Sequence, residues 1–237
     1  SFRGLEKLEI LSLNSNMIKI IENQYFLDLI NLKFLHLKWN QIQTIENRSF
    51  LNLRKLTFID LDNNKLVDLE EITFKNLFNL KKLSLVSNFI SNFHTDLNTS
   101  NKFNLTNLNL EFNNIKQLKN NTFKSMCLYL TTMNIEKNQV KEIEIDSFKC
   151  LSKLNYLNIS FNQINYLFVG TFQDLKSLLV LDLSQNNIDN LKKDTFHGLI
   201  NLEYIFLNNN KISKIDSSIF ENLLNIYRNL KPIYIYM

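Results

Sequence analysis

A hydrophobic pattern with a fixed period runs along most of the chain. In its clearest copy, residues 154–172 read L-x-x-L-x-I-x-x-N-x-I-x-x-L, and Phe172 follows ten residues after Asn162. The same Asn recurs in steps of 24 or 25 residues, at Asn16, Asn40, Asn64, Asn88, Asn113, Asn138, Asn162, Asn186 and Asn210. A period held this strictly is the signature of a repeat architecture in which each unit stacks on the next.

The alternating residues before each Asn predict one short strand per repeat. Alternation with a period of two directs the Leu side chains to one side of a sheet and the intervening residues to the other. A Phe on each return, such as Phe50 or Phe172, would stack with its neighbours into a column of rings. The repeat Asn would donate to and accept from backbone groups of adjacent turns. The predicted fold class is an α/β solenoid: a curved horseshoe with a parallel concave sheet and an irregular or short-helical convex side.

Two segments depart from the period. In residues 80–104 the expected Phe is replaced by Asn98, and we expect a local irregularity there, with Leu97 or Phe103 filling the vacancy. Residues 230–235 keep the L-x-x-I-x-I spacing without an Asn and contain Pro232, which suits an edge strand. We therefore predict nine repeats of 24–25 residues and a degenerate terminal strand. They would form a single domain over residues 1–237, a fragment that lacks both caps.

The 24-residue repeats with their Phe column resemble the typical class of leucine-rich repeat, over residues 2–223. The opening FRGL and the segment NNTFKSMCLYLTTMNIEKNQV are similar to ectodomains of leucine-rich-repeat hormone receptors of the relaxin type. Toll-type ectodomains and secreted or adhesive repeat proteins are similar as well. The resemblance implies an extracellular or cell-surface glycoprotein, part of a signalling receptor ectodomain, that binds a protein or peptide ligand.

Amino-acid composition excludes few of the possible cellular locations and partner classes. Three Gly and one Pro among 237 residues leave no flexible linker, and no apolar run approaches the length of a membrane span. Any membrane tether would therefore lie outside this chain. No secretory signal opens the chain, which keeps a cytosolic interaction scaffold open beside a secreted adhesive or structural protein. The net charge of +4 comes without a dense Lys/Arg block, so we expect no nucleic-acid partner.

The residues that alternate with the buried Leu positions form three columns on the concave face. These columns hold five acids and two lysines, which favours a partner with a basic patch. Aromatic residues recur in the first column and beside three repeat Asn residues, as they do at protein interfaces. The candidate partner-binding residues are His36, Lys38, Trp39, Phe58, Asp60, Asp62, Asn109, Glu111, Phe112, Glu136, Tyr156, Asn158, Phe161, Asp182, Tyr204 and Phe206.

Candidate modifications involve asparagines and the two cysteines. The N-x-S/T pattern occurs at Asn47, Asn98, Asn104, Asn120 and Asn158. A glycan at Asn158 would stand on the concave face and block it. Cys127 and Cys150 fall in adjacent turns, where a disulfide and two separate buried thiols both fit the spacing.

No catalytic or metal-binding constellation stands out in the sequence. His36, His94 and His197 are scattered, and no nucleophile elbow, zincin, P-loop or C-x-x-C motif is present. We therefore expect no enzymatic activity, no cofactor and no metal.

Overall fold

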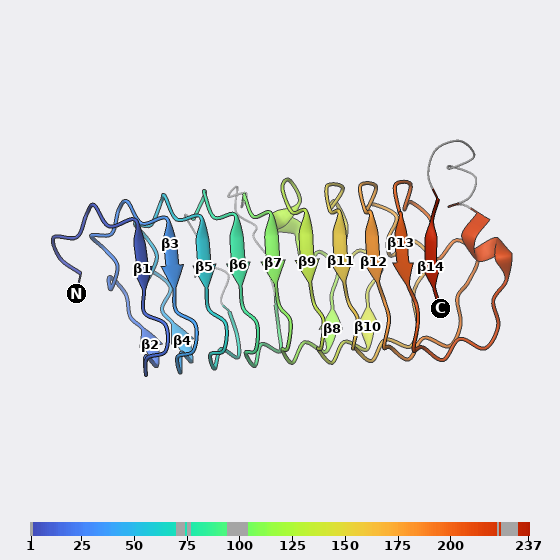
Figure 1. The fold of residues 1–237 in the computed structure, drawn as a ribbon, viewed down its shortest axis with the longest axis horizontal. Coiled ribbons are helices and arrows are strands. Elements are labelled where there is room, and N and C mark those ends of the chain that lie inside the picture. Colours follow the sequence, from blue (N-terminus) through green and yellow to red (C-terminus); the bar gives the residue numbers. More distant parts are fainter. Residues whose placement is uncertain (1, 70–73, 75–76, 94–103, 222, 224–231) are drawn as a thin grey trace.

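The computed structural model describes residues 2–69, 74, 77–93, 104–221, 223 and 232–237. One long parallel sheet runs from end to end of the molecule, with its strands side by side in chain order (Figure 1). Its strands are β1 Ile10–Ser12, β3 Phe34–His36, β5 Phe58–Asp60, β6 Lys82–Ser84, β7 Asn107–Asn109, β9 Thr132–Asn134, β11 Tyr156–Asn158, β12 Val180–Asp182, β13 Tyr204–Phe206 and β14 Tyr234–Tyr236. This parallel solenoid confirms the predicted leucine-rich-repeat fold.

Two smaller parallel pairs lie along the lower margin in Figure 1, where the chain leaves the main sheet. β2 Ile20–Ile21 pairs with β4 Thr44–Ile45, and β8 Gln117–Leu118 pairs with β10 Glu142–Ile143. The return across the back is irregular, and the described residues include the short 3-10 helices η2 Lys124–Met126 and η3 Ser217–Phe220. The small pairs were not predicted, because two-residue strands leave no period in the sequence.

The core lies between the sheet and a column of stacked phenylalanine rings. Leu157 and Leu181, the central residues of β11 and β12, are fully buried, and so is Phe172 behind them. The column comprises Phe2, Phe26, Phe50 and Phe74 in one run and Phe93, Phe123, Phe148, Phe172, Phe196 and Phe220 in another. Successive centroids lie 5.8–6.4 Å apart, so each repeat depends on both neighbours for its burial.

Phe93 extends the column in the repeat that lacks the usual Phe. Its ring is 6.0 Å from that of Phe123 and tilted by 34° to it. Leu97 and Phe103, the replacements expected from the sequence, lie outside the described residues. The buried ring next to Phe123 therefore comes from the segment directly after the repeat's own Asn88.

The repeat Asn residues bind the backbone of adjacent turns, as predicted. Asn162 donates from Nδ2 to the carbonyls of Ile135 and Ile159, at 3.0 and 3.1 Å. Its Oδ1 accepts from the N–H of Val140 at 2.9 Å. The same set of bonds recurs from Asn40 to Asn210, so buried backbone groups at the turn are satisfied in each repeat.

The degenerate terminal strand is present. β14 pairs in parallel with β13, and Tyr234 stands opposite Tyr204. Among the described residues, no helix has the length and apolar character needed to cross a bilayer.

Candidate functional site

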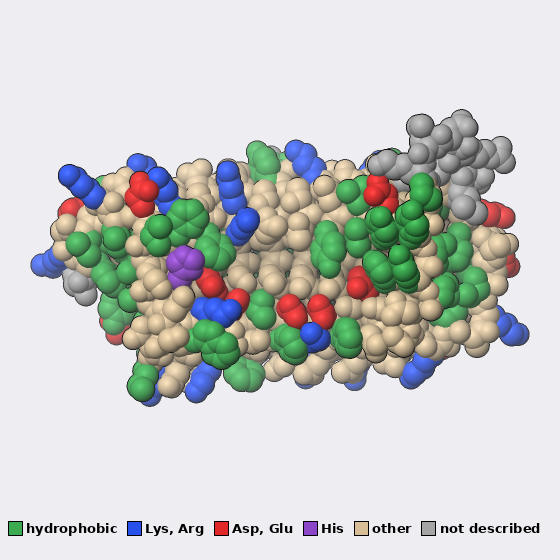
Figure 2. All heavy atoms as spheres, in the orientation of Figure 1, with side chains coloured by type: hydrophobic (Ala, Val, Ile, Leu, Met, Phe, Trp, Pro, Cys, Tyr) green, Lys and Arg blue, Asp and Glu red, His purple; other side chains and the backbone are tan. Residues whose placement is uncertain are grey.

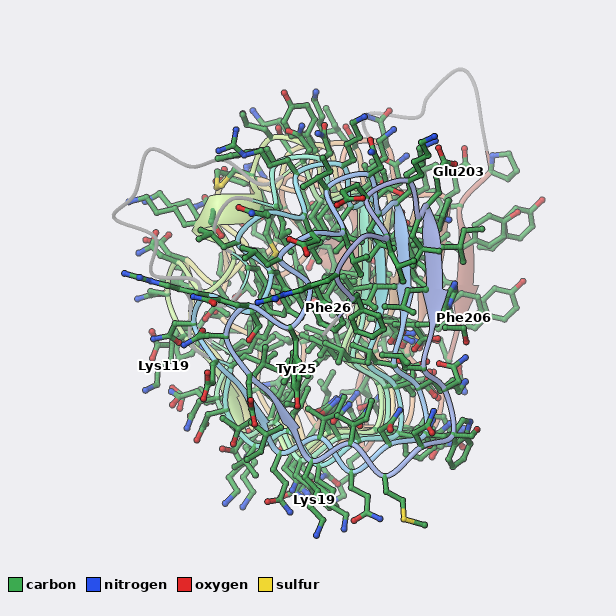
Figure 3. The ribbon with its side chains drawn as sticks, turned by 90° about the vertical axis from the view of Figure 1, so that its left-hand side faces the viewer. Lys19, Tyr25, Phe26, Lys119, Glu203 and Phe206 are labelled. Carbon is green, nitrogen blue, oxygen red and sulfur yellow. A yellow bond between two sulfur atoms is a disulfide. The ribbon has the colours of Figure 1, made fainter. Side chains whose placement is uncertain are left out.

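The strand register assembles the three predicted columns on the open face of the sheet. Tyr156 lies between Thr132 and Val180 in the first column, and Asn158 lies between Asn134 and Asp182 in the second. On this face, acidic side chains gather near the middle and hydrophobic side chains gather towards both ends (Figure 2). Figure 3 shows Phe206 projecting from the sheet on this side, while Phe26 lies inside the coil.

Several second-column side chains support the backbone. Each accepts a hydrogen bond of 2.9–3.0 Å from the N–H two residues further along, in the manner of an Asx turn. The acceptors are Asp60, Asn109, Asn134, Asn158 and Asp182. The oxygen that accepts this bond therefore has a structural role in each of these side chains.

In the second column, His36 and Ser84 do not accept such a bond, and a third-column residue of the preceding repeat accepts it in place of each. Asn14 Oδ1 accepts from the N–H of Lys38 at 2.8 Å. Asp62 Oδ1 accepts from the N–H of Val86 at 2.8 Å and from the Ser84 hydroxyl at 2.6 Å. Asp62 is one of the candidate partner-binding residues, and one of its two carboxylate oxygens thus has a structural role.

A loose group of candidates surrounds β3 and β5. The rings of His36 and Phe58 meet edge to face at 5.3 Å. The Lys38 ammonium is 3.8 Å from Asp62 Oδ2 and 6.0 Å from the centroid of the Trp39 ring. Trp39 is 58% exposed, so its ring is available to a partner.

Asp60 is a half-buried carboxyl on this face. Burial raises its pKa above the usual 3.8, and the negative charge of Asp62 acts in the same direction. The hydrogen bond from the Asp62 N–H and the nearby charge of Lys38 oppose the shift. Asp60 and Asp182 form no ion pair within the part of the chain that the structure describes.

A tight group of candidates forms between β7 and β11, and its centre is Lys137. The Lys137 ammonium is 2.9 Å from Glu136 Oε1 and 3.4 Å from Glu111 Oε1. It lies over the Phe112 ring, 4.3 Å from the centroid, and 5.5 Å from the centroid of Phe161. The side-chain hydrogen bond to Glu136 is the main cause that raises the pKa of Lys137. Lys137 was not among the sequence candidates, because only aromatic residues were selected at the position before the repeat Asn, as with Phe112 and Phe161.

The residue before each repeat Asn adopts a positive φ. The angles are 58° at Trp39, 54° at Phe112, 52° at Lys137 and 52° at Phe161. A left-handed conformation costs a non-glycine residue about 1–2 kcal/mol. The hydrogen bonds of the repeat Asn that follows hold the turn in this conformation. The conformation directs the side chain of the left-handed residue away from the core. Phe112 and Phe161 remain 47% and 46% exposed.

Tyr156 lies beside this tight group, in the first column. Burial raises its pKa, and the charges of Asp182 and Glu136 raise it further. Its hydroxyl therefore stays protonated well above neutral pH and can donate a hydrogen bond.

Aromatic side chains cover the face over β13 and β14. Tyr204 stacks on Tyr234 with centroids 5.0 Å apart, and Phe206 stacks on Tyr236 at 4.6 Å. Tyr234 and Tyr236 are missing from the sequence candidates because the degenerate strand carries no repeat Asn to mark its columns. Their spacing from Ile235 was the available signal.

The sequons differ in accessibility. Asn47 and Asn120 are exposed, Asn104 is half-buried, and Asn98 lies outside the described residues. Asn158 is only 5% exposed, and its Nδ2, the atom that would carry a glycan, donates to Glu136 Oε2 at 3.1 Å. This geometry argues against the predicted glycan at Asn158 and leaves the face unobstructed there.

Cys127 and Cys150 form a disulfide with Cα atoms 5.3 Å apart, which joins η2 to the return of the next repeat. Among the described residues, no three His, Cys, Asp or Glu side chains converge as metal ligands.

The profile of the leucine rich repeat family matches residues 6–66, 103–164, 161–212 and 180–228. No curated protein sequence matches the chain.

Several solved structures share the fold. The Toll chain of the Toll–Spatzle complex from Drosophila superposes with a TM-score of 0.85 at 23% identity, over 98% of this chain and 31% of that one. TLR13 in complex with ssRNA13 gives 0.75 at 23% identity, over 97% and 40%. The leucine-rich-repeat domain of APL1B gives 0.75 at 21% identity, over 91% and 61%. The chain therefore spans less than two thirds of each of these proteins.

Proposed function

The chain belongs to the leucine-rich-repeat family, and on that premise we propose that it is a non-catalytic recognition module whose concave sheet face binds a protein or peptide partner. The observation that carries the proposal is the sheet itself. Ten strands in continuous register present columns of acidic and aromatic side chains, most of them half-buried at the sheet and reaching solvent on this face. Aromatic anchors surrounded by polar groups are characteristic of protein interfaces.

The charge of the face supports a basic partner patch, more weakly than the sequence implied. The five acids of the columns are balanced by Lys38, Lys82 and Lys137, which gives 3 − 5 = −2. Lys38 and Lys137 already pair with Asp62, Glu111 and Glu136. The carboxylates of Asp60 and Asp182 are thus the ones we expect to attract a cationic patch.

We place the chain in an extracellular receptor ectodomain. Toll in its complex with Spatzle is the structural neighbour that supports a protein ligand. The Cys127–Cys150 disulfide favours an oxidising compartment over the cytosol, which weighs against a cytosolic scaffold. TLR13 is seen with single-stranded RNA, but a face with a net negative charge would repel phosphates, so we expect no RNA binding here.

Selection from a random peptide library tests the proposal. Peptides selected on the wild-type chain should be basic, and the double variant Tyr156→Ala/Tyr204→Ala should weaken their binding about tenfold or more, as expected for interface anchors. Tyr129→Ala is the matched control, since Tyr129 is an exposed aromatic residue outside the columns. Acidic peptides, or equal losses in both variants, would contradict the proposal. A single-stranded RNA oligonucleotide, used as a second probe, should not bind.

A further inference from the structure

The four side chains around the Lys137 ammonium have the composition of a cation-binding cage. We define the 111/136 cage as Glu111, Phe112, Glu136 and Phe161. Two carboxylates lie within 3.4 Å of the ammonium, and two ring centroids lie within 5.5 Å. Charge-assisted hydrogen bonds combined with cation–π contacts are how proteins recognise ammonium and guanidinium groups. The chain's own lysine occupies a site of the kind that a ligand cation would use.

The walls of the cage are held independently of Lys137. The second carboxylate oxygen of Glu111 accepts from Asn134 Nδ2 at 3.3 Å, and that of Glu136 accepts from Asn158 Nδ2 at 3.1 Å. The N–H groups of Phe112 and Phe161 donate to the carbonyls of Glu136 and Ser184, at 3.0 and 3.1 Å. These backbone bonds fix both aromatic residues in their left-handed conformation. The cage therefore keeps its shape when the lysine leaves.

The occupant is held less firmly than the walls. The Lys137 side chain is 34% exposed, whereas those of Glu111 and Glu136 are 21% and 19% exposed. Because the lysine stem is flexible and the ion pair is partly solvated, moving the Lys137 ammonium from the carboxylates into solvent costs little free energy.

We propose that the 111/136 cage binds an arginine side chain of the partner, and that this arginine displaces the Lys137 ammonium. A planar guanidinium fits the cage better than an ammonium, because it stacks on a ring face while its fork donates to two carboxylates. Lys137 then serves as an internal competitor that offsets part of the negative charge of the cage until a partner arrives. This inference rests on the proposed role of the concave face and names the chemistry that part of it recognises.

The test measures the affinity of the acetylated and amidated peptide Gly-Gly-Arg-Gly-Gly for three variants by NMR titration. Lys137→Met removes the competitor, so the peptide should bind about three- to tenfold more tightly, since apparent affinity rises with the fraction of empty sites. Phe112→Leu should weaken binding in the Lys137→Met background. Lys82→Met is the matched control, because Lys82 is an exposed lysine of the same face outside the cage. It removes the same charge and should change the affinity by less than about twofold.

Each outcome bears on the inference directly. Unchanged or weaker binding in Lys137→Met would overturn it, and so would equal tightening in Lys82→Met, which would indicate a general charge effect. Thermal unfolding of each variant distinguishes lost binding from lost folding. The loss caused by Phe112→Leu assigns the peptide to the cage and not to Asp60 or Asp182, so a positive result would stand even if library peptides bound elsewhere on the chain.

Discussion

The loose group of candidates around β3 and β5 and the tight group between β7 and β11 contain nearly the same residue types in very different arrangements. Around β3 and β5, Lys38 stands 3.8 Å from its carboxylate and 6.0 Å from its ring. Around β7 to β11, the corresponding distances for Lys137 are 2.9 Å and 4.3 Å, with a second carboxylate and a second ring nearby. The two groups are alike in composition but differ in what a partner could contact. The first has an exposed Trp39 and an Asp60 carboxylate without an ion pair in the described part of the chain, whereas the second is a cage that already holds Lys137.

The difference originates in where the lysine stands in the repeat. Lys38 belongs to the third column and points along the face beside Asp62. Lys137 takes the left-handed position before the repeat Asn, which carries its side chain back across Glu111. A count of charges along the columns cannot distinguish a neutralised carboxylate from an available one.

The largest expected effect comes from removing the support beneath each group. Asn138→Ala loses the acceptor for the buried Ile115 N–H, and Asn40→Ala loses the acceptor for the partly buried Ile18 N–H. Each variant also loses the donor to backbone carbonyls of its own and the preceding repeat, so each should cost about 3–5 kcal/mol of unfolding free energy. Equal losses of unfolding free energy in urea denaturation would show that the two groups differ in their exposed side chains and not in the hydrogen bonds of the repeat Asn beneath them.

Asn16→Ala is the control for this pair. Asn16 is exposed, and its bonds within the described part of the chain go to Leu13 and Asn14, so we expect a loss of about 1 kcal/mol or less. A loss as large as that of Asn138→Ala would contradict the role assigned to the bonds between repeats.

A smaller effect should separate the two ion pairs. Glu136→Gln removes the charge nearest Lys137 and should lower the Tm, by more at low salt than at physiological salt, as expected of a partly exposed pair. Asp62→Asn should change stability by less than about 0.3 kcal/mol, since the amide oxygen still accepts from Ser84 and Val86 and Lys38 is distant. Thermal unfolding at low and physiological salt measures both, and equal costs would remove the contrast between the groups.

The smallest effect concerns Asp60 and pH. Because burial raises its pKa in the folded state, the protonated form stabilises the fold, and this contribution is lost as pH rises through the folded-state value. Asp60→Asn keeps the acceptor for the Asp62 N–H, so it should raise the Tm slightly at pH 7 and have no effect well below pH 3.8. A lower Tm at pH 7 would indicate that the Asp60 carboxylate is stabilised by its neighbours.

Much of the architecture could be predicted from the sequence because it depends on the spacing of residues along the chain. The period of the Asn residues predicted the repeats, and the alternation around Leu157 predicted which side chains share the face with Tyr156. Even the degenerate strand at Tyr234–Tyr236 was found from the spacing of Ile233 and Ile235.

The side-chain contacts at the candidate site were harder to predict because they depend on where each side chain extends in space. Phe93 joins the ring column from a position outside the Phe register, and no count of spacing places it there. Lys137 enters the cage from a left-handed turn, a conformation that its residue type does not favour. The burial of Asn158 follows from its bond to Glu136 across the strand pair, which the N-x-S pattern does not register.

The most direct test of the contrast is the proton chemical shift of the lysine ε-methylene groups in the free protein. Ring currents from Phe112 and Phe161 should move the Lys137 signal upfield, and Phe112→Leu should return most of that shift. The Lys38 signal should stay close to that of an unstructured lysine. Equal signals from Lys137 and Lys38 would contradict the account, because they would mean that the 111/136 cage does not hold its lysine.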